Sequence, residues 1–195
     1  MKEVILFSAL LLLLIFPGYS QTKLGLKAGV NWATMDFKNN FANSYHYRTG
    51  FHVGASVERS IGEKAFVRSE LFYSRKGYEA RSIRFPDNKS TTDFDYLNIP
   101  LLVGYKLPSG ISFYLGPEVS YNLGNTVKPK TKKDFDFGVD GGILYSFTDA
   151  LSFDLRYTYG FVKMSNVKSV NDGEPLYDGQ NRVAQLGVNY YFKKR

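Results

Sequence analysis

Catalysis would have to come from a small set of residues in this sequence. There are two histidines, His46 and His52, and His52 lies at alternate positions with Ser56 and Glu58. A histidine beside a serine and an acid could activate the hydroxyl as a nucleophile for lipid acyl transfer or hydrolysis. On one strand, however, these side chains point the same way into a crowded interior. We therefore interpret His52 as a hydrogen-bonded interior residue and expect no catalytic site there.

Four aspartates form a second candidate site, Asp93, Asp95, Asp134 and Asp136. They fall near the outer ends of two expected strands, where carboxylates could hold Ca²⁺ or assist peptide hydrolysis. Together with His46 they leave an enzyme active on lipid or peptide at the rim as an alternative. No glycine-anchored loop supports a metal site, and no phosphate loop, Cys/His metal spacing or nucleotide motif is present. We favour a solvated rim, and expect no cofactor and no enzymatic activity.

Charged residues of both signs also alternate with apolar ones along several stretches. A side-chain period of two places them on one face of a strand. If the strands close into a barrel, these charges face one another across its interior and pair. We expect such an interior ion network from nine residues: Lys27, Glu58, Arg68, Glu70, Glu118, Asp136, Asp140, Asp154 and Arg156.

The overall charge is basic, +7 with a pI of about 9.4. Because the chain begins with an export signal, described below, we expect anionic lipid headgroups and lipopolysaccharide phosphates as counter-charges, and no nucleic acid. Four lysines cluster in one expected outer loop, and they could contact lipopolysaccharide phosphates or belong to a disordered hydrophilic loop. They are Lys128, Lys130, Lys132 and Lys133.

The elements that position these residues are strands. The alternation is clearest over residues 182–192, where Leu186, Val188 and Tyr190 share an apolar face. A tilted strand needs about 9–11 residues to cross a bilayer, and each of the alternating stretches is at least that long. Seven further stretches show the pattern: residues 23–32, 49–58, 65–78, 93–106, 111–122, 134–147 and 151–163.

The connections between these strands alternate in length. Short ones cover residues 59–64, 107–110 and 148–150, and longer ones cover residues 33–48, 79–92, 123–133 and 164–180. Short periplasmic turns and long outer loops are typical of outer-membrane barrels. We therefore predict an all-β fold, an eight-stranded antiparallel up-and-down transmembrane β-barrel.

The cost of burying charge in lipid predicts which face points outward. An Arg or Lys at the bilayer midplane costs about 2–4 kcal/mol, so the charged face should line the interior. That face is also rich in glycine, which leaves room for long side chains in a narrow eight-stranded barrel. Mixed charges argue against an ion-selective open pore. The alternatives are a small porin-like or solute-binding barrel, and a soluble lipocalin-like barrel with the two faces reversed.

The first residues predict export. Lys2 precedes an apolar run over residues 4–16, too short for a membrane helix, and Pro17–Gly18 ends it. We expect residues 1–20 to be a signal peptide cleaved near Ser20/Gln21, and residues 21–195 to be the barrel domain in the outer membrane. The absence of cysteine excludes a disulfide framework.

Three stretches resemble the PorT-like family of outer-membrane β-barrels of Bacteroidota. They are LGLKAGVN at residues 24–31, SELFYSRKG at residues 69–77 and YLNIPLL at residues 96–102. The resemblance covers nearly all of the mature chain and implies an eight-stranded barrel, related to OmpA-like barrels, for which most members have no assigned activity. The last strand also resembles the signal read by the barrel-assembly machinery, in Gln185, Gly187, Tyr190 and Phe192.

We therefore expect a non-enzymatic barrel with a filled polar interior. Its role would be structural, adhesive or partner-docking in the cell envelope. The expected partners are outer-membrane lipid and lipopolysaccharide, the assembly machinery, and an envelope protein bound through the outer loops.

Overall fold

Strands make up almost all of the part of the chain that the structure describes. The structure is a computed structural model, and it describes residues 22–38, 43–82, 89–125, 135–162, 164–165 and 178–192. Its strands are β1 (Thr22–Lys38), β2 (Asn43–Ile61), β3 (Ala65–Ser82), β4 (Lys89–Lys106), β5 (Ile111–Asn125), β6 (Phe135–Ser146), β7 (Leu151–Gly160), β8 (Met164–Ser165) and β9 (Asp178–Tyr191).

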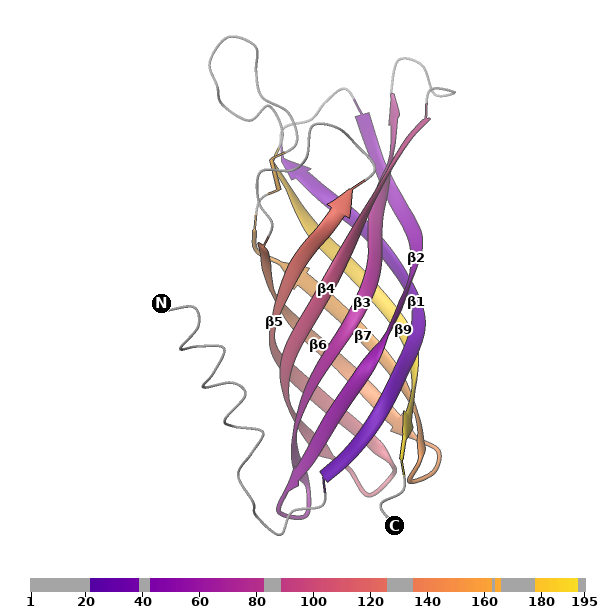
Figure 1. Cartoon of the computed structure of the whole chain (residues 1–195), viewed down its shortest axis with the longest axis vertical. Coiled ribbons are helices and arrows are strands. Elements are labelled where there is room, and N and C mark those ends of the chain that lie inside the picture. The colour runs from indigo at the N-terminus through magenta and orange to yellow at the C-terminus, as the bar shows by residue number, and fades with distance from the viewer. Residues whose placement is uncertain are drawn as a thin grey trace.

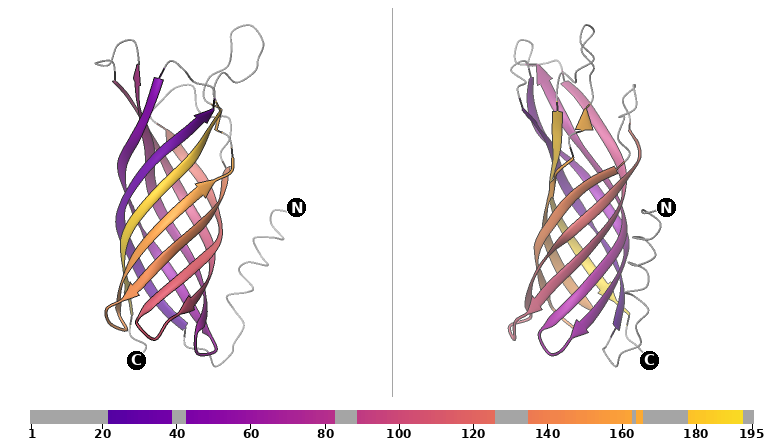
Figure 2. Two further views of the ribbon diagram at one scale, coloured as in Figure 1. Left: turned by 180° about the vertical axis from the view of Figure 1, so that it is seen from behind. Right: turned by 90° about the vertical axis from the view of Figure 1, so that its left-hand side faces the viewer.

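These strands close into a barrel, shown in Figures 1 and 2. From β1 to β7 each strand pairs antiparallel with the next, and β9 pairs with both β7 and β1. The two residues of β8 pair with the start of β9, beyond the end of β7, so β8 adds no ninth wall strand. The fold is therefore the predicted eight-stranded antiparallel barrel. Closure pairs the sheet edges that an open sheet would expose.

The two faces of the wall are sorted as predicted. Along β7 every second residue is buried, so that Leu155 is 55% exposed whereas its neighbour Arg156 is 1% exposed. All nine charged residues predicted for the interior are buried. The outward face carries large apolar side chains on every strand from β1 to β7 and on β9, including Leu26, Val53, Leu71, Val103, Leu115, Phe137, Leu155 and Leu186.

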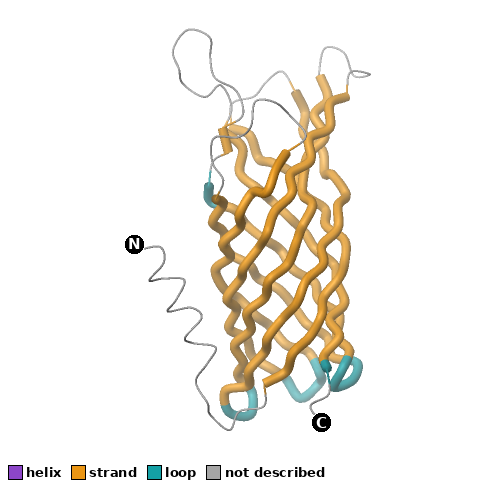
Figure 3. The backbone as a smooth tube through the Cα atoms, in the orientation of Figure 1, coloured by secondary structure: helices purple, strands orange, loops and turns teal. Residues whose placement is uncertain are grey.

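Short turns close the end of the barrel that we call the inner end, where Figure 3 draws the teal loops. Gly62 and Gly110 have φ angles of 67° and 82° in two of these turns. Residues with side chains rarely adopt that conformation, so glycine is suited to both positions.

The predicted outer ends of the first four strands are wrong. Residues 33–38 and 43–48, expected in a loop, extend β1 and β2, and β3 and β4 run on to Ser82 and from Lys89. Apolar alternation marks only the part of a strand that meets lipid. Above that level the backbone ladder continues with polar residues, for example in the pairing of Ser44 with Arg81. The outer connections are correspondingly shorter than expected.

Aromatic side chains lie in two outward-facing bands. Tyr121 and Phe135 pack together near the outer end with ring centroids 5.0 Å apart. Near the inner end Phe147 contacts Phe153 at 5.0 Å, and Tyr190 contacts Phe192 at 5.6 Å. Such girdles mark the two membrane interfaces of a transmembrane barrel.

Two predictions concern residues that the structure does not describe. The export signal at residues 1–20 and the lysine cluster Lys128, Lys130, Lys132 and Lys133 both lie outside the described ranges. Among the described residues, no helix is both long and apolar enough to cross a membrane.

Candidate functional site

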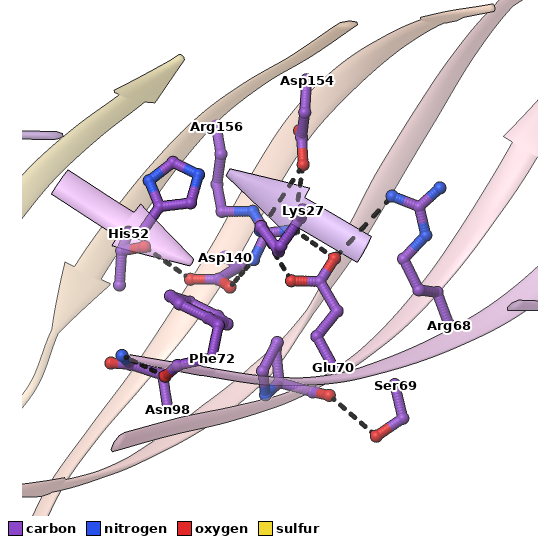
Figure 4. A network of polar contacts seen from close by, with 12 residues as sticks. Lys27, His52, Arg68, Ser69, Glu70, Phe72, Asn98, Asp140, Asp154 and Arg156 are labelled. Atoms are coloured by element: carbon purple, nitrogen blue, oxygen red, sulfur yellow. Dashed lines mark hydrogen bonds and ion pairs between the residues drawn. The ribbon is translucent and has the colours of Figure 1, made fainter. Parts of the chain in front are cut away.

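The carboxylate of Glu70, on β3, lies at the centre of the barrel interior. It contacts Lys27 at 2.8 Å, Arg156 at 2.8 Å and Arg68 at 3.7 Å. Figure 4 shows these three cations around it. Glu70 and Arg156 are separated by 86 residues in sequence, so the contact depends on barrel closure. One buried carboxylate thus connects strands β1, β3 and β7.

Arg156 completes this central layer. Its guanidinium also contacts Asp140 at 3.1 Å and Asp154 at 3.2 Å, and its Nε donates to the Tyr114 hydroxyl at 3.0 Å. Thr158 donates to the second oxygen of Asp140 at 2.7 Å. The layer holds the cations Lys27, Arg68 and Arg156 against the carboxylates Glu70, Asp140 and Asp154, so opposite charges balance within it.

A second layer lies toward the inner end. The Glu58 carboxylate accepts from Arg68 Nη2 at 2.6 Å and from Lys106 Nζ at 2.7 Å. The Tyr191 hydroxyl contacts Glu58 at 3.3 Å and also accepts a hydrogen bond from Arg68. Arg68 therefore bridges this layer to the central one.

A third layer lies toward the outer end. Lys76 contacts Glu118 at 3.2 Å and Asn98 at 2.8 Å, and Ser120 donates to both of these partners. Nearby, Asp136 accepts from the Asn181 amide at 2.6 Å. All of the predicted interior charges therefore take part in polar contacts, and all are buried.

Apolar side chains fill the barrel at both ends of this polar core. Phe66, Leu102, Tyr114 and Leu144 cluster on the inner side. Met35, Phe94 and Tyr96 cluster on the outer side, and Tyr78 packs against them. At Gly104 a Cβ atom would lie 2.2 Å from the ring of Phe66, so glycine allows the ring to occupy the interior.

Sequence reasoning did not identify these apolar clusters, nor Lys76 and Lys106. Lys76 could have been found, because it shares the period-two face of Arg68 and Glu70 on β3. The clusters could not, because runs such as Leu101–Leu102–Val103 are apolar on both faces. In such a run the alternation that separates the two faces is absent.

The catalytic candidates do not assemble into a site. His52 Nδ1 lies 2.7 Å from the Asn31 side chain, and Glu58 contacts Arg68 and Lys106 instead of His52. The His52 ring packs edge-on against Phe72. This arrangement agrees with our interpretation of His52 as a hydrogen-bonded interior residue.

The predicted cluster of four aspartates is also not formed. Asp136 points inward, whereas Asp93 and Asp95 point outward from β4 and form ion pairs with arginines, and Asp134 lies outside the described residues. Strand alternation explains the separation, since odd and even positions face opposite sides of the wall. Within the described ranges, no group of three or more histidines or acidic residues could hold a metal ion.

An exterior ion-pair patch lies instead above the outer aromatic band. It consists of the pairs Arg48–Asp93 at 3.0 Å, Arg75–Asp95 at 2.8 Å and Arg81–Glu79 at 2.6 Å. Its side chains are 20–45% exposed. Hydrogen bonding from Arg75 lowers the pKa of the Asp95 carboxyl below its ordinary value.

This shift gives a measurable expectation for Asp95. Its carboxyl should titrate below the value of about 3.9 for unperturbed aspartate. The contact with Arg75 is therefore complete at neutral pH and is lost as the pH falls through the lowered pKa. A ¹³C NMR titration of the Asp95 carboxyl would measure the midpoint. Replacing Arg75 by glutamine should raise it, and an unchanged midpoint would contradict the assignment.

Comparisons with known proteins place this geometry among outer-membrane barrels. The family described as "Outer membrane protein beta-barrel domain" matches residues 19–166. A search of curated protein sequences finds no significant match.

Solved structures share the fold. Neisserial surface protein A has a TM-score of 0.53 and 19% identity, with 88% of this chain and 99% of that chain covered. Ail of Yersinia pestis, in complex with a heparin analogue, has a TM-score of 0.50 and 13% identity, with 88% and 99% covered. OprG of Pseudomonas aeruginosa has a TM-score of 0.50 and 13% identity, with 91% and 99% covered. Because these sequence identities are low, the three structures show that the fold is shared and nothing about function.

Proposed function

Because the chain belongs to the outer membrane protein β-barrel domain family, we propose that it is a closed, non-enzymatic barrel with a structural, adhesive or partner-docking role in the outer membrane. The family and the fold indicate the outer membrane as its location. The proposed role goes beyond this location. It rests on the side chains that fill the barrel interior and on the charged side chains at the outer end.

The observation that carries this proposal is the filled interior. Polar layers occupy its middle, with the Phe66 cluster on one side and the Phe94 cluster on the other. A selective pore would line a water path with charges of one sign. Here cations and carboxylates contact each other directly, as in the pairs of Glu70 with Lys27 and Arg156. This arrangement supports a closed barrel over the porin-like alternative.

Conductance across planar lipid bilayers tests the closed barrel directly. We expect the purified protein to give no steady current under conditions in which a reconstituted porin conducts. If it does conduct, replacing Glu70 and Arg156 by alanine should change the ion selectivity, which would favour the porin-like function. A large, steady conductance from the unmodified protein would contradict our proposal.

The outer end offers the surface for docking. Strands β2, β3 and β4 contain 18–19 residues, whereas β6 and β7 contain 12 and 10, so the wall is uneven at this end (Figure 2). The higher wall carries the exterior ion-pair patch. We propose that its arginines, with the loop lysines Lys128, Lys130, Lys132 and Lys133, meet lipopolysaccharide phosphates. An envelope protein bound through the outer loops is the other proposed partner.

We further propose that the chain belongs with the PorT-like group within its broader family. The three stretches that support this resemblance lie on β1, β3 and β4, and supply Lys27, Glu70, Lys76 and Asn98 to the interior. Cleavage near Ser20/Gln21 and recognition of the last strand by the assembly machinery remain part of this proposal. In that strand Tyr190 and Phe192 face outward, and Gln185 and Gly187 face inward.

A further inference from the structure

A small polar cavity opens at the inner end of the barrel. Its volume is about 200 Å³. That is below the roughly 300 Å³ at which pockets for drug-sized ligands begin, so it suits one small functional group. Its lining includes the charged residues Lys23, Glu58, Arg68, Lys106 and Asp149, and Tyr191.

The cavity has an excess of positive charge. Lys23, Arg68 and Lys106 line it, against the carboxylates of Glu58 and Asp149. Both Arg68 and Lys106 contact the single carboxylate of Glu58, and Lys23 Nζ lies 3.5 Å from the backbone carbonyl oxygen of Asp149. Asp149 itself lies on an exposed turn, where water and salt screen its charge. The local field therefore favours an anion.

Two buried polar side chains lie one inward-facing position further along their strands than residues of the cavity lining, and do not line the cavity themselves. Ser56 is the next inward-facing residue after Glu58 on β2, and Asn189 is the next after Tyr191 on β9. Ser56 Oγ and both polar atoms of the Asn189 side chain have no hydrogen-bond partner among the described residues. Their exposures are 1% and 0%. Such unpaired groups are costly in a folded protein, and they place an unsatisfied polar region above the cavity.

We propose that this inner cavity binds a carboxylate group delivered from the periplasmic side. Lys106 and Lys23 would attract the charge, and Lys106 would donate to the bound oxygens. The buried guanidinium of Arg68, held by Glu58 and Tyr191, provides a fixed positive wall. A carboxylate fits the small volume, whereas a nucleotide does not. The source is either a small solute or the C-terminus of a periplasmic polypeptide.

Titration of the full-length mature barrel in lipid nanodiscs tests this site. Sodium acetate is added, and NMR signals of Ser112, Leu144 and Tyr191 are followed, with acetamide as the neutral isostere. We expect saturable shifts with acetate and none with acetamide. Lys106→Gln should weaken binding about five- to tenfold, as expected for losing one charge-assisted contact. Lys23→Gln provides a second variant if Lys106→Gln fails to fold.

The control is Lys64→Gln, which removes a charge from the exposed turn between β2 and β3, outside the cavity. It should leave binding unchanged. If Lys64→Gln weakened acetate binding as much as Lys106→Gln, the inner end would attract anions by its overall positive charge and not through a defined site. That result would overturn the proposal. A short peptide and its C-terminally amidated form are then compared. Binding of the free-acid peptide alone indicates a polypeptide source, binding of acetate alone indicates a small solute, and binding of neither rejects the site.

Discussion

Replacing Glu70 by glutamine should destabilise the folded barrel by about 3–5 kcal/mol, the usual cost of removing one partner from a buried ion pair. Glu70 is fully buried and contacts Lys27, Arg156 and Arg68. Without its charge, these cations share only the carboxylates of Asp140, Asp154 and Glu58 as ion-pair partners among the described residues. The excess positive charge would be held in an interior with few routes to water. The expected loss is a large part of the stability of an ordinary domain.

Urea unfolding of the barrel in lipid vesicles would measure this loss. Folded and unfolded forms are separated by gel mobility without heating, and the midpoint gives the change in free energy. Glu79→Gln is the matched control, since Glu79 lies on the same strand but faces outward at the rim and pairs with Arg81. Its substitution should have little effect, because exposed ion pairs contribute little to stability. Similar losses in the two variants would show that the interior network does not support the fold.

A double substitution tests whether the partner assigned to Glu70 is correct. Lys27 lies 2.8 Å from the Glu70 carboxylate and over the ring of Phe72. Lys27→Met alone should also be destabilising, because it leaves a carboxylate in excess. Combined with Glu70→Gln, it should cost less than the sum of the two single losses, since the remaining interior charges balance again. Strictly additive losses would mean that the two residues do not interact.

The sequence was sufficient to predict the fold, the inward direction of the nine charged side chains and the mixed charge of the interior. All three depend on a period of two, which is independent of the exact pairing between strands. Arg156 illustrates this point. Its position between Leu155 and Tyr157 establishes that it faces inward. Nothing local shows that its partners are Asp140 on β6 and Glu70 on β3, because those contacts require the closed barrel and its register.

The limits of sequence reasoning lie where the alternation of polar and apolar residues fails. At the outer end both faces are polar, so β2 continues through Asn43–Tyr47 without a sequence signal. In the interior, Phe94 and Tyr96 are apolar neighbours of the outward-facing Leu97, so the outer cluster resembles a lipid-facing surface. The small inner cavity depends on two turns, on several strands and on Tyr191, which come together only in the folded barrel.

Placing arginine at Leu155 should destabilise the barrel in a bilayer by about 2–4 kcal/mol, the cost of a charge on the lipid face near the midplane. Leu155 faces outward, and its neighbours in register are Ile143 on β6 and Leu186 on β9, both exposed and apolar. It lies between the inner and outer aromatic bands on β7. The guanidinium of an arginine at this position has no acidic side chain among its neighbours in register, Ile143 and Leu186. It can reach water only if the side chain bends toward one of the two membrane interfaces.

The same urea measurement applies, with two controls that isolate the effect of lipid. Leu155→Ala reports the loss of apolar contacts without a charge. Leu107→Arg places the charge on an exposed inner turn and should change stability by less than about 0.5 kcal/mol. If the barrel stood in water instead of lipid, the outward-facing Leu155 would be hydrated and would tolerate arginine. A Leu155→Arg variant as stable as Leu107→Arg would therefore show that the apolar outer face does not meet lipid, and would contradict the membrane location.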